Sequence, residues 1–227
     1  MDSVGPRAAQ GCASDHSAIP SAPMRIVIVG AGGQGAIVAD ALLRADTPPL
    51  GFVDDAREGD VLGVPILGRL DALATIAHDT IVVAIGDNAA RRRLCAELVA
   101  RGETLVTARH PWSSIAASAS IGAGSMISAG AIVAPRATIG RGVLLNTKCS
   151  VDHDAVIGDF VHLSPGSTIG GNVHVGEETM IGLGASVMSD CRVGARCVIG
   201  AGAVVVRDIP DGVVAFGVPA RVQRRLG

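Results

Sequence analysis

The stretch "IGAGSMISAGAIVAPRATIG" at residues 121–140 decides the fold, because an aliphatic residue returns at every sixth position. The same spacing runs without a slip from Ile115 to Val205. A fixed period of this kind indicates architecture more strongly than local propensity does. All sixteen positions of the series are aliphatic: Ile115, Ile121, Ile127, Val133, Ile139, Leu145, Val151, Ile157, Leu163, Ile169, Val175, Ile181, Val187, Val193, Ile199 and Val205.

A second series of small or β-branched residues stands four places after these anchors. It predicts a second column of side chains that point inwards. Three of the five cysteines fall in this column and are therefore interpreted as small core residues. Its members are Ala119, Ser125, Ala131, Ala137, Val143, Cys149, Ala155, Val161, Ser167, Val173, Thr179, Ala185, Cys191, Cys197 and Ala203.

Glycine often follows the anchor, as at Gly122 and Gly140, where a corner of the chain needs a tight or positive-φ backbone. Each hexad is therefore interpreted as one short face plus one corner, and such repeats stack as a parallel β-helix. The pattern resembles that of the left-handed hexapeptide acyltransferases, whose three-hexad coils form a triangular prism. Their left-handed sense comes from the resemblance alone, since parallel crossovers are normally right-handed. Sixteen hexads then make about five coils over residues 111–208.

The resemblance also covers the end of the chain and the assembly. Prisms of this class commonly form trimers with active sites between neighbouring subunits, so a homotrimer is expected. The chain ends with RDIP, then GVPA and a basic tail, and this order resembles the ending of these enzymes. For residues 209–227 we expect a helical cap over the last coil, with Arg221, Arg224 and Arg225 exposed to solvent. A contact of this tail with coenzyme A phosphates is compatible with that expectation.

Composition and charge exclude several classes of function. Nineteen basic and twenty-one acidic residues give a net charge of −2, which does not suit a nucleic-acid partner. The longest apolar runs are too short to span a bilayer, which needs ~20 apolar residues. Residues 1–23 lack the features of a secretory signal and are expected to be a disordered leader. Five cysteines without a CxxC pair indicate neither a disulfide framework nor a thiolate zinc site, so the reducing cytoplasm is the expected compartment.

Residues 24–110 follow a different pattern, in which strands alternate with helices. The expected strands lie at 25–30, 50–55, 80–86 and 104–107, and the expected helices at 36–44, 69–77 and 89–101. This alternation predicts a small parallel α/β sheet, a Rossmann-like half-domain that precedes the β-helix.

The sequence GAGGQG follows the first expected strand, so that Gly30, Gly32 and Gly35 satisfy GxGxxG. Asp54 stands near the place where an acid would meet a ribose hydroxyl, which suggests NAD. However, these residues hold only one mononucleotide-binding half, and a dinucleotide normally needs two. A single nucleotide is the better interpretation. The alternative is a glycine turn that only lets a helix pack closely on its strand.

Three histidines fall within the repeats, at His153, His162 and His174. The positions of His153 and His162 lie outside both inward columns, so we expect both on the surface. The γ-type carbonic anhydrases, another hexapeptide class, bind zinc through three histidines between subunits. The close His-x4-His spacing expected for that site is missing here, so no metal site is predicted.

Five motifs in order make the resemblance narrower: GAGGQG, the VDD at 53–55, AIGDN at 84–88, NTKCSVDHDAVIGDFVHLSPG at 146–166, and GVPA. From Met24 to Arg225 the chain resembles the bacterial nucleotide-sugar N-acetyltransferases that acetylate 4-amino-4-deoxy sugars in the bacillosamine and perosamine pathways. The related sialic acid O-acetyltransferases share this layout.

The resemblance implies roles for residues of the prism. His153 stands in the place of the base, Asp154 in that of the carboxylate that raises its basicity, and His162 beside acetyl-CoA, the cosubstrate. Gly171 would lie near the acetyl group, where a backbone N–H can stabilise the oxyanion, and Gly182 and Leu183 would line the pantetheine. A sugar amine that attacks a thioester must lose a proton, and an imidazole, with an ordinary pKa of about 6.5, can accept it. Adjacent strand residues point to opposite faces, so a contact from His153 to Asp154 needs a corner, and Asp152 is the competing partner.

The resemblance also assigns residues to the sugar nucleotide. The phosphate-side turn is Gly32, Gly33 and Gln34, the nucleoside residues are Asp54 and Asp55, the third-strand edge is Gly86 with Asn88, and Asn146 reaches the sugar from the prism. Gln34 departs from the family pattern, in which histidine is frequent. Lys148 is the only lysine of the chain, and either meets a substrate phosphate or carboxylate or is simply exposed.

Together these observations predict an acetyl-CoA-dependent N-acetyltransferase that acts on the 4-amino group of a nucleotide-linked sugar. A sialate-type sugar O-acetyltransferase is the nearest alternative. An NAD-linked oxidoreductase and a non-catalytic nucleotide-sugar sensor are the alternatives from other classes.

Overall fold

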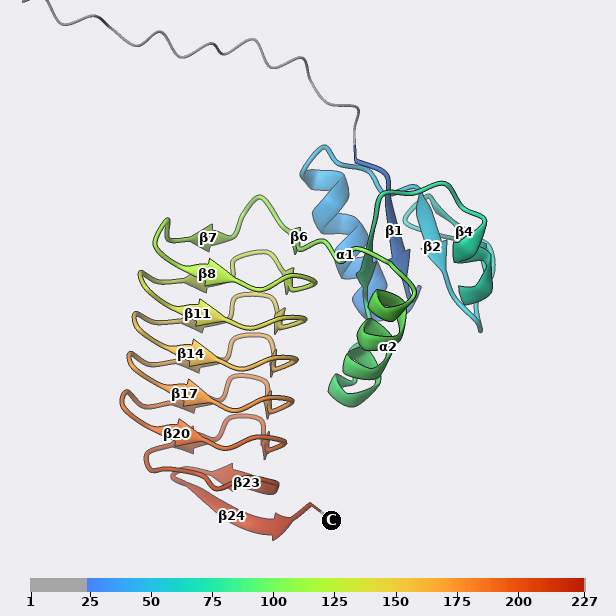
Figure 1. The fold of residues 1–227 in the computed structure, drawn as a ribbon. Coiled ribbons are helices and arrows are strands. Elements are labelled where there is room, and N and C mark those ends of the chain that lie inside the picture. The colour runs from blue at the N-terminus through green and yellow to red at the C-terminus, as the bar shows by residue number, and fades with distance from the viewer. Residues whose placement is uncertain (1–23, 227) are drawn as a thin grey trace, which may run out of the picture.

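The computed structural model describes residues 24–226, and the expected leader at 1–23 lies outside the described residues. The N-terminal domain is built on a five-stranded sheet with the order β3-β4-β2-β1-β5 (Figure 1). All its pairings are parallel except that of β3 with β4. Its elements are β1 (Ile26–Val29), α1 (Gly33–Arg44), β2 (Gly51–Val53), β3 (Asp60–Val61), β4 (Val64–Gly68), the 3-10 helix η1 (Leu70–Ala74), β5 (Thr80–Val83) and α2 (Asn88–Ala100). The α/β domain predicted from the sequence is confirmed.

Two local predictions in this domain need correction. The expected strand at 104–107 is wrong, because only Leu105 makes a bridge to Ile81. The expected helix at 69–77 is the shorter 3-10 helix η1. The continuous apolar strands β1 and β5 are fully buried, as strands covered on both faces must be.

The second half is a hexapeptide-repeat β-helix of two-residue strands, as predicted. Each strand pairs in parallel with the strand one coil before and one coil after it, as β13 pairs with β10 and β16. The strands are β6 (Ala108–Arg109), β7 (Ser114–Ile115), β8 (Ser120–Ile121), β9 (Met126–Ile127), β10 (Ile132–Val133), β11 (Thr138–Ile139), β12 (Leu144–Leu145), β13 (Ser150–Val151), β14 (Val156–Ile157), β15 (His162–Leu163), β16 (Thr168–Ile169), β17 (His174–Val175), β18 (Met180–Ile181), β19 (Ser186–Val187), β20 (Arg192–Val193), β21 (Val198–Ile199) and β22 (Val204–Val205).

Three sheets form the sides of the prism. The first face contains β7, β10, β13, β16, β19 and β22; the second face contains β8, β11, β14, β17 and β20; the third face contains β6, β9, β12, β15, β18 and β21. The aliphatic anchors and the second inward column fill the interior, and Cys149, Cys191 and Cys197 are free and buried there, as predicted.

Positive φ and close approach of neighbouring coils occur at different positions of each hexad, although the sequence suggested one position for both. Left-handed backbone recurs every sixth residue, three places after the anchor, and most of these positions are not glycine: Lys148 has φ 58° and Asp154 φ 59°. The glycines that directly follow the anchors instead allow close approach of the coils, because a Cβ at Gly122 would lie 2.5 Å from the Gly140 carbonyl carbon. The expected tight corner is confirmed at those glycines, and the positive φ lies elsewhere.

The expected helical cap is wrong. Residues 209–227 contain an antiparallel hairpin of β23 (Val213–Gly217) and β24 (Ala220–Arg225), and β23 continues the third face by pairing with β21. The backbone polar groups of the last coil therefore find strand partners there. Arg221, Arg224 and Arg225 are exposed, as expected.

The N-terminal domain packs on the upper part of the third face, with α1 next to β6 (Figure 1). One buried cluster contains Ile28 and Leu42 of the domain together with Met126 and Leu144 of the prism. A second cluster joins Leu98 of α2 to Phe160, at the corner between the second and third faces. No helix in the described part of the chain is long and apolar enough to cross a membrane.

Candidate active site

His153 lies in the turn between β13 and β14, at the corner between the first and second faces. Its Nδ1 is 2.8 Å from Oδ2 of Asp154. Because Asp154 has left-handed backbone, two neighbouring residues turn their side chains toward each other, which an extended strand would prevent. Asp152 accepts the backbone N–H of His153 at 2.7 Å instead. Of the two candidate carboxylates, Asp154 is the one that contacts the imidazole.

Arg136 completes this corner, and the sequence analysis missed it. It stands eighteen residues before Asp154, and its Nε and Nη2 donate to the two carboxylate oxygens at 2.7 and 2.8 Å. The hydrogen bonds from Arg136 and then His153 hold the pKa of Asp154 far below its usual range. The carboxylate therefore stays ionised while it accepts the Nδ1–H of His153. The coil period of three hexads was the signal that could have found this pair.

Gly171 lies beneath the ring of His153. A Cβ at Gly171 would come within 2.8 Å of Cε1 and 2.9 Å of Nε2 of His153. The missing side chain thus leaves room for the imidazole. With the Nδ1 proton directed to Asp154, Nε2 keeps the lone pair that a base requires.

His162 occupies a different place, on β15 in the third face. The expectation that both histidines lie on the surface is correct for His153 and wrong for His162, which is partly buried. Burial, with a contribution from the charge of Arg91, lowers the pKa of His162 to about 4. The Nδ2 atom of Asn146 lies 3.4 Å from Nε2 of His162, while Oδ1 of Asn146 accepts the N–H of Thr147. His162 is therefore neutral at pH 7, and its Nε2 is placed to accept.

The glycine turn between β1 and α1 combines packing and open space. A Cβ at Gly35 would lie 2.2 Å from the Gly30 carbonyl oxygen, so this glycine permits the helix to pack on its strand. At Gly32 and Gly33 a Cβ would meet nothing within 4 Å. The N-terminus of α1 is thus accessible, a position that favours an anion. Gln34 in the first turn points to the third face, with Nε2 4.0 Å from Sδ of Met126.

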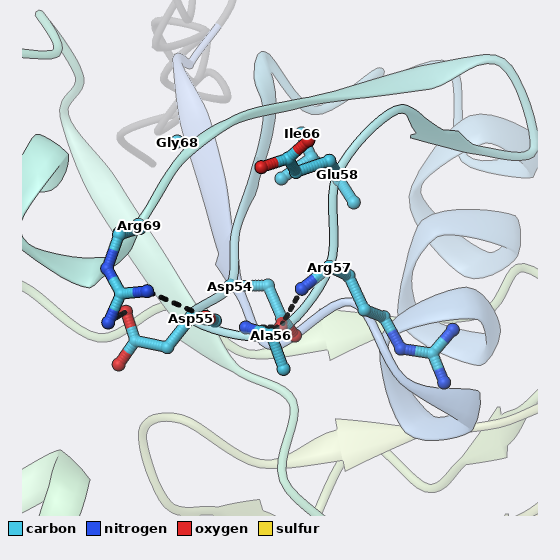
Figure 2. Close-up of a pocket in the computed structure, with 8 residues that line it drawn as sticks. All are labelled: Asp54, Asp55, Ala56, Arg57, Glu58, Ile66, Gly68 and Arg69. Atoms are coloured by element: carbon cyan, nitrogen blue, oxygen red, sulfur yellow. Dashed lines mark hydrogen bonds and ion pairs between the residues drawn. The ribbon is translucent and has the colours of Figure 1, made fainter.

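Asp54 and Asp55 border a pocket of about 390 Å³ at the end of β2, shown in Figure 2. Partial burial disfavours the charge of Asp54, but its carboxylate accepts the backbone N–H groups of Ala31, Ala56 and Arg57 at 2.7–3.0 Å, which lowers its pKa. Asp54 therefore connects the glycine turn to the pocket loop. Oδ1 of Asp55 accepts the N–H of Leu70 at 3.0 Å.

Gly86 and Asn88 border a second cleft, of about 330 Å³, between the start of α2 and the third face. Met180, next to His162 across the strand pair, lines it from the prism. Nδ2 of Asn88 donates to the carbonyl oxygen of Glu178 at 3.0 Å. Of the residues expected to line pantetheine, Leu183 is exposed, whereas a Cβ at Gly182 would lie 2.6 Å from the carbonyl oxygen of Ile199. Gly182 is thus needed for coil packing.

The structure divides the expected site residues into two groups. His153, Asp154 and Gly171 lie at the corner between the first and second faces. A second group, on or against the third face, comprises Asn146, His162, Gly32, Gly33, Gln34, Gly86 and Asn88. Gly182 and Leu183 directly follow β18 of the third face, and Asp54 and Asp55 directly follow β2 of the N-terminal domain. In a triangular prism that corner lies opposite the third face, so one chain does not bring the two groups together. Within residues 24–226, no three His, Cys, Asp or Glu side chains gather in a way that could hold a metal ion.

Comparisons with known proteins show the family of the chain. Two family models match: the PglD N-terminal domain over residues 25–98 and the bacterial transferase hexapeptide (six repeats) over residues 172–207. A search of curated proteins finds no match.

Three solved structures are similar over 88% of this chain. The acetyltransferase domain of PglB from Neisseria gonorrhoeae FA1090 is 38% identical, with a TM-score of 0.85 over 99% of that chain. A mutant of perosamine N-acetyltransferase from Caulobacter crescentus, in complex with CoA and GDP-perosamine, is 37% identical, with a TM-score of 0.86 over 97% of that chain. WeeI from Acinetobacter baumannii AYE is 32% identical, with a TM-score of 0.81 over 100%.

Proposed function

Because the chain belongs to the hexapeptide-repeat sugar acetyltransferases that carry a PglD-type N-terminal domain, we propose that it transfers the acetyl group of acetyl-CoA to the 4-amino group of a nucleotide-linked deoxy sugar. The observation that carries this proposal is the arrangement of Arg136, Asp154 and His153, which ends in a free Nε2 above Gly171.

In the proposed reaction the sugar amine attacks the carbonyl carbon of the thioester. His153 accepts the proton of the attacking nitrogen at Nε2, while Asp154 holds the Nδ1–H and stabilises the imidazolium. The carbon–sulfur bond then breaks, the coenzyme leaves as its thiolate, and the imidazolium returns a proton to the sulfur. An N–H donor at Gly171 would stabilise the oxyanion, since this residue adjoins the ring of the base. The neutral His162 and exposed Leu183 would lie along the coenzyme.

The N-terminal domain would hold the nucleotide part of the acceptor. The open N-terminus of α1 at Gly32 and Gly33 suits a phosphate group. The pocket at Asp55 and Arg57 suits a nucleoside, because it offers both a carboxylate and a guanidinium (Figure 2). The perosamine N-acetyltransferase structure, which contains GDP-perosamine, supports an acceptor of this class.

A homotrimer is part of this proposal. His153 and the N-terminal domain of the same chain lie on opposite sides of the prism, so the base needs an acceptor site from a neighbouring copy. Trimers of parallel prisms supply such a neighbour at every interface. We also assign the reaction to the cytoplasm, the reducing compartment in which the buried free cysteines of the described chain would persist.

Release of coenzyme A thiol from acetyl-CoA tests the proposal, with a panel of UDP-, GDP- and dTDP-linked 4-amino sugars beside free sialic acid. We expect turnover of one amino sugar and a loss of at least ~100-fold in kcat for His153→Ala. His174→Ala is the matched control, because His174 is another histidine of the prism, on β17 of the second face, and lies outside the proposed site. Turnover of sialic acid alone would instead assign O-acetylation, and release without any acceptor dependence would contradict sugar acetylation.

A further inference from the structure

Arg91 is the largest fully buried side chain of the described structure, and the proposed reaction does not use it. It lies in the first turns of α2, where the helix meets the corner between the second and third faces. Charged side chains are almost never fully buried unless they are paired. The position of Arg91 therefore needs a reason beyond helix packing.

All five N–H groups of the guanidinium have acceptors, and these acceptors come from both domains. Nη1 donates to the carbonyl oxygens of Ile85 and Gly86 at 2.8 and 3.1 Å, and Nη2 to Oδ1 of Asn88 at 2.8 Å. Nε donates to the carbonyl oxygen of Gly142 at 2.8 Å, and Nη2 to that of Phe160 at 2.9 Å. One side chain thus binds the turn after β5 to two successive coils of the prism.

The acceptors are neutral, so no ion pair offsets the cost of burying this charge. Burial lowers the pKa of Arg91 to about 10, which still leaves it protonated at pH 7. Apolar residues of similar volume often replace buried charges without loss of stability. What they cannot replace is the planar fork, which fixes several carbonyl groups in one geometry.

The turn that Arg91 holds contains Gly86 and Asn88, which border the cleft against the third face. Its charge also acts on His162, the partly buried histidine of that face. We propose that Arg91 is a positioning residue, whose guanidinium sets the Gly86–Asn88 turn against the strand of His162 and so shapes the acceptor side of the site. The expected change in KM for the nucleotide sugar rests on the proposed function. The expected effect of Arg91 on His162 does not.

The test compares Arg91→Lys and Arg91→Met with Arg93→Met, a control at an exposed position of the same helix. The first measurement is the pKa of His162, followed by NMR with labelled histidine rings and assigned with His162→Gln. We expect Arg91→Met to raise this pKa, because a nearby positive charge is removed, and Arg91→Lys and Arg93→Met to leave it close to the wild-type value.

The second measurement is steady-state kinetics. A lysine has three N–H donors in place of five, so Arg91→Lys should raise the KM for the nucleotide sugar about tenfold or more while the KM for acetyl-CoA stays unchanged. A purely structural role would lower the thermal stability of Arg91→Lys without this selective change in KM. A wild-type KM for both substrates in Arg91→Lys overturns the inference, as does an unchanged His162 pKa in Arg91→Met.

The two measurements also separate this inference from the proposed function. If Arg91→Met does not fold, Arg91→Lys decides the question through the two KM values. If the wild-type protein acetylates no sugar, the proposed function fails, and the His162 titration in Arg91→Met still decides whether Arg91 acts on that strand.

Discussion

His153 and Asp154 are neighbours in the chain, and yet their side chains face each other, with Nδ1 2.8 Å from Oδ2. The left-handed backbone at Asp154 makes this contact possible. The same conformation recurs every sixth residue from Gly124 to Gly202, so the prism supplies it at most of its corners. A carboxylate directly after a histidine contacts the imidazole here because of where the two residues fall in the repeat.

Removing the charge of Asp154 should impair the chemical step. Asp154→Asn keeps the size of the side chain but allows the imidazole to adopt the other tautomer, so kcat should fall by about 10²- to 10⁴-fold with little change in KM. Steady-state thiol release measures both. Asp190→Asn is the matched control, because Asp190 occupies the same corner column two coils further and bonds Asn172 instead. Equal losses in the two variants would contradict the assignment.

Adding one methyl group at Gly171 should displace the imidazole of His153 without disturbing the fold. A Cβ there meets the His153 ring at 2.8 Å, so Gly171→Ala must push the imidazole from its position. We expect kcat to fall at least tenfold while the thermal midpoint stays near that of the wild type, since the ring of His153 is exposed and can move. Asn172→Ala, at the next position, should retain activity. Wild-type kcat in Gly171→Ala would show that the ring position is unimportant.

The glycines after the anchors should control stability rather than activity. A Cβ at Gly176 would lie 2.4 Å from the backbone nitrogen of Ala195, whereas one at Gly202 meets nothing within 4 Å. Gly176→Ala should therefore lower the unfolding free energy by roughly 1–3 kcal/mol or more through overpacking. Gly202→Ala carries only the strain of its positive φ, about 1 kcal/mol. Thermal unfolding measures the stability of both variants. An equal loss of unfolding free energy would refute the idea that Gly176 is needed for the close approach of neighbouring coils.

His78 should make stability depend on pH. Burial disfavours its charge, but the carboxylate of Glu103 at Nε2 and the carbonyl oxygen of Ile76 at Nδ1, each 2.7 Å away, outweigh burial and raise its pKa. Both partners are acceptors, so the ring is held as the imidazolium. The folded-state pKa exceeds the unfolded value, hence the contribution is complete below about pH 6.5 and is lost as pH rises through the folded-state pKa.

Unfolding midpoints of the wild type and His78→Gln between pH 5 and 9 measure this dependence. The advantage of the wild type should be largest at low pH and should fade as the pH rises. An advantage that grows with pH would show that the neutral ring is the form that the fold stabilises.

The six-residue repeat predicts the parallel β-helix, and the family resemblance adds its triangular form. The anchors from Ile115 to Val205 never leave the six-residue register, and stacking of successive coils buries them in one continuous core, with Ile115 and Ile121 partly buried against it. The α/β pattern of the first half was equally readable, because buried strands such as β1 are continuous apolar runs. The hairpin at the C-terminal end was not readable from the sequence, because GVPA and its basic tail carry no periodic signal that separates a hairpin from a helix.

The sequence by itself therefore determined the two architectures, the family resemblance and the position of His153 outside the inward columns. Only the tertiary structure decided which side chains meet across coils and between domains. Arg136 reaches Asp154 from one coil earlier, and Arg91 binds carbonyl groups that lie 51 and 69 residues away. The physical reason is that hydrophobic periodicity reports burial within one element, whereas hydrogen bonds between distant segments depend on how the elements pack.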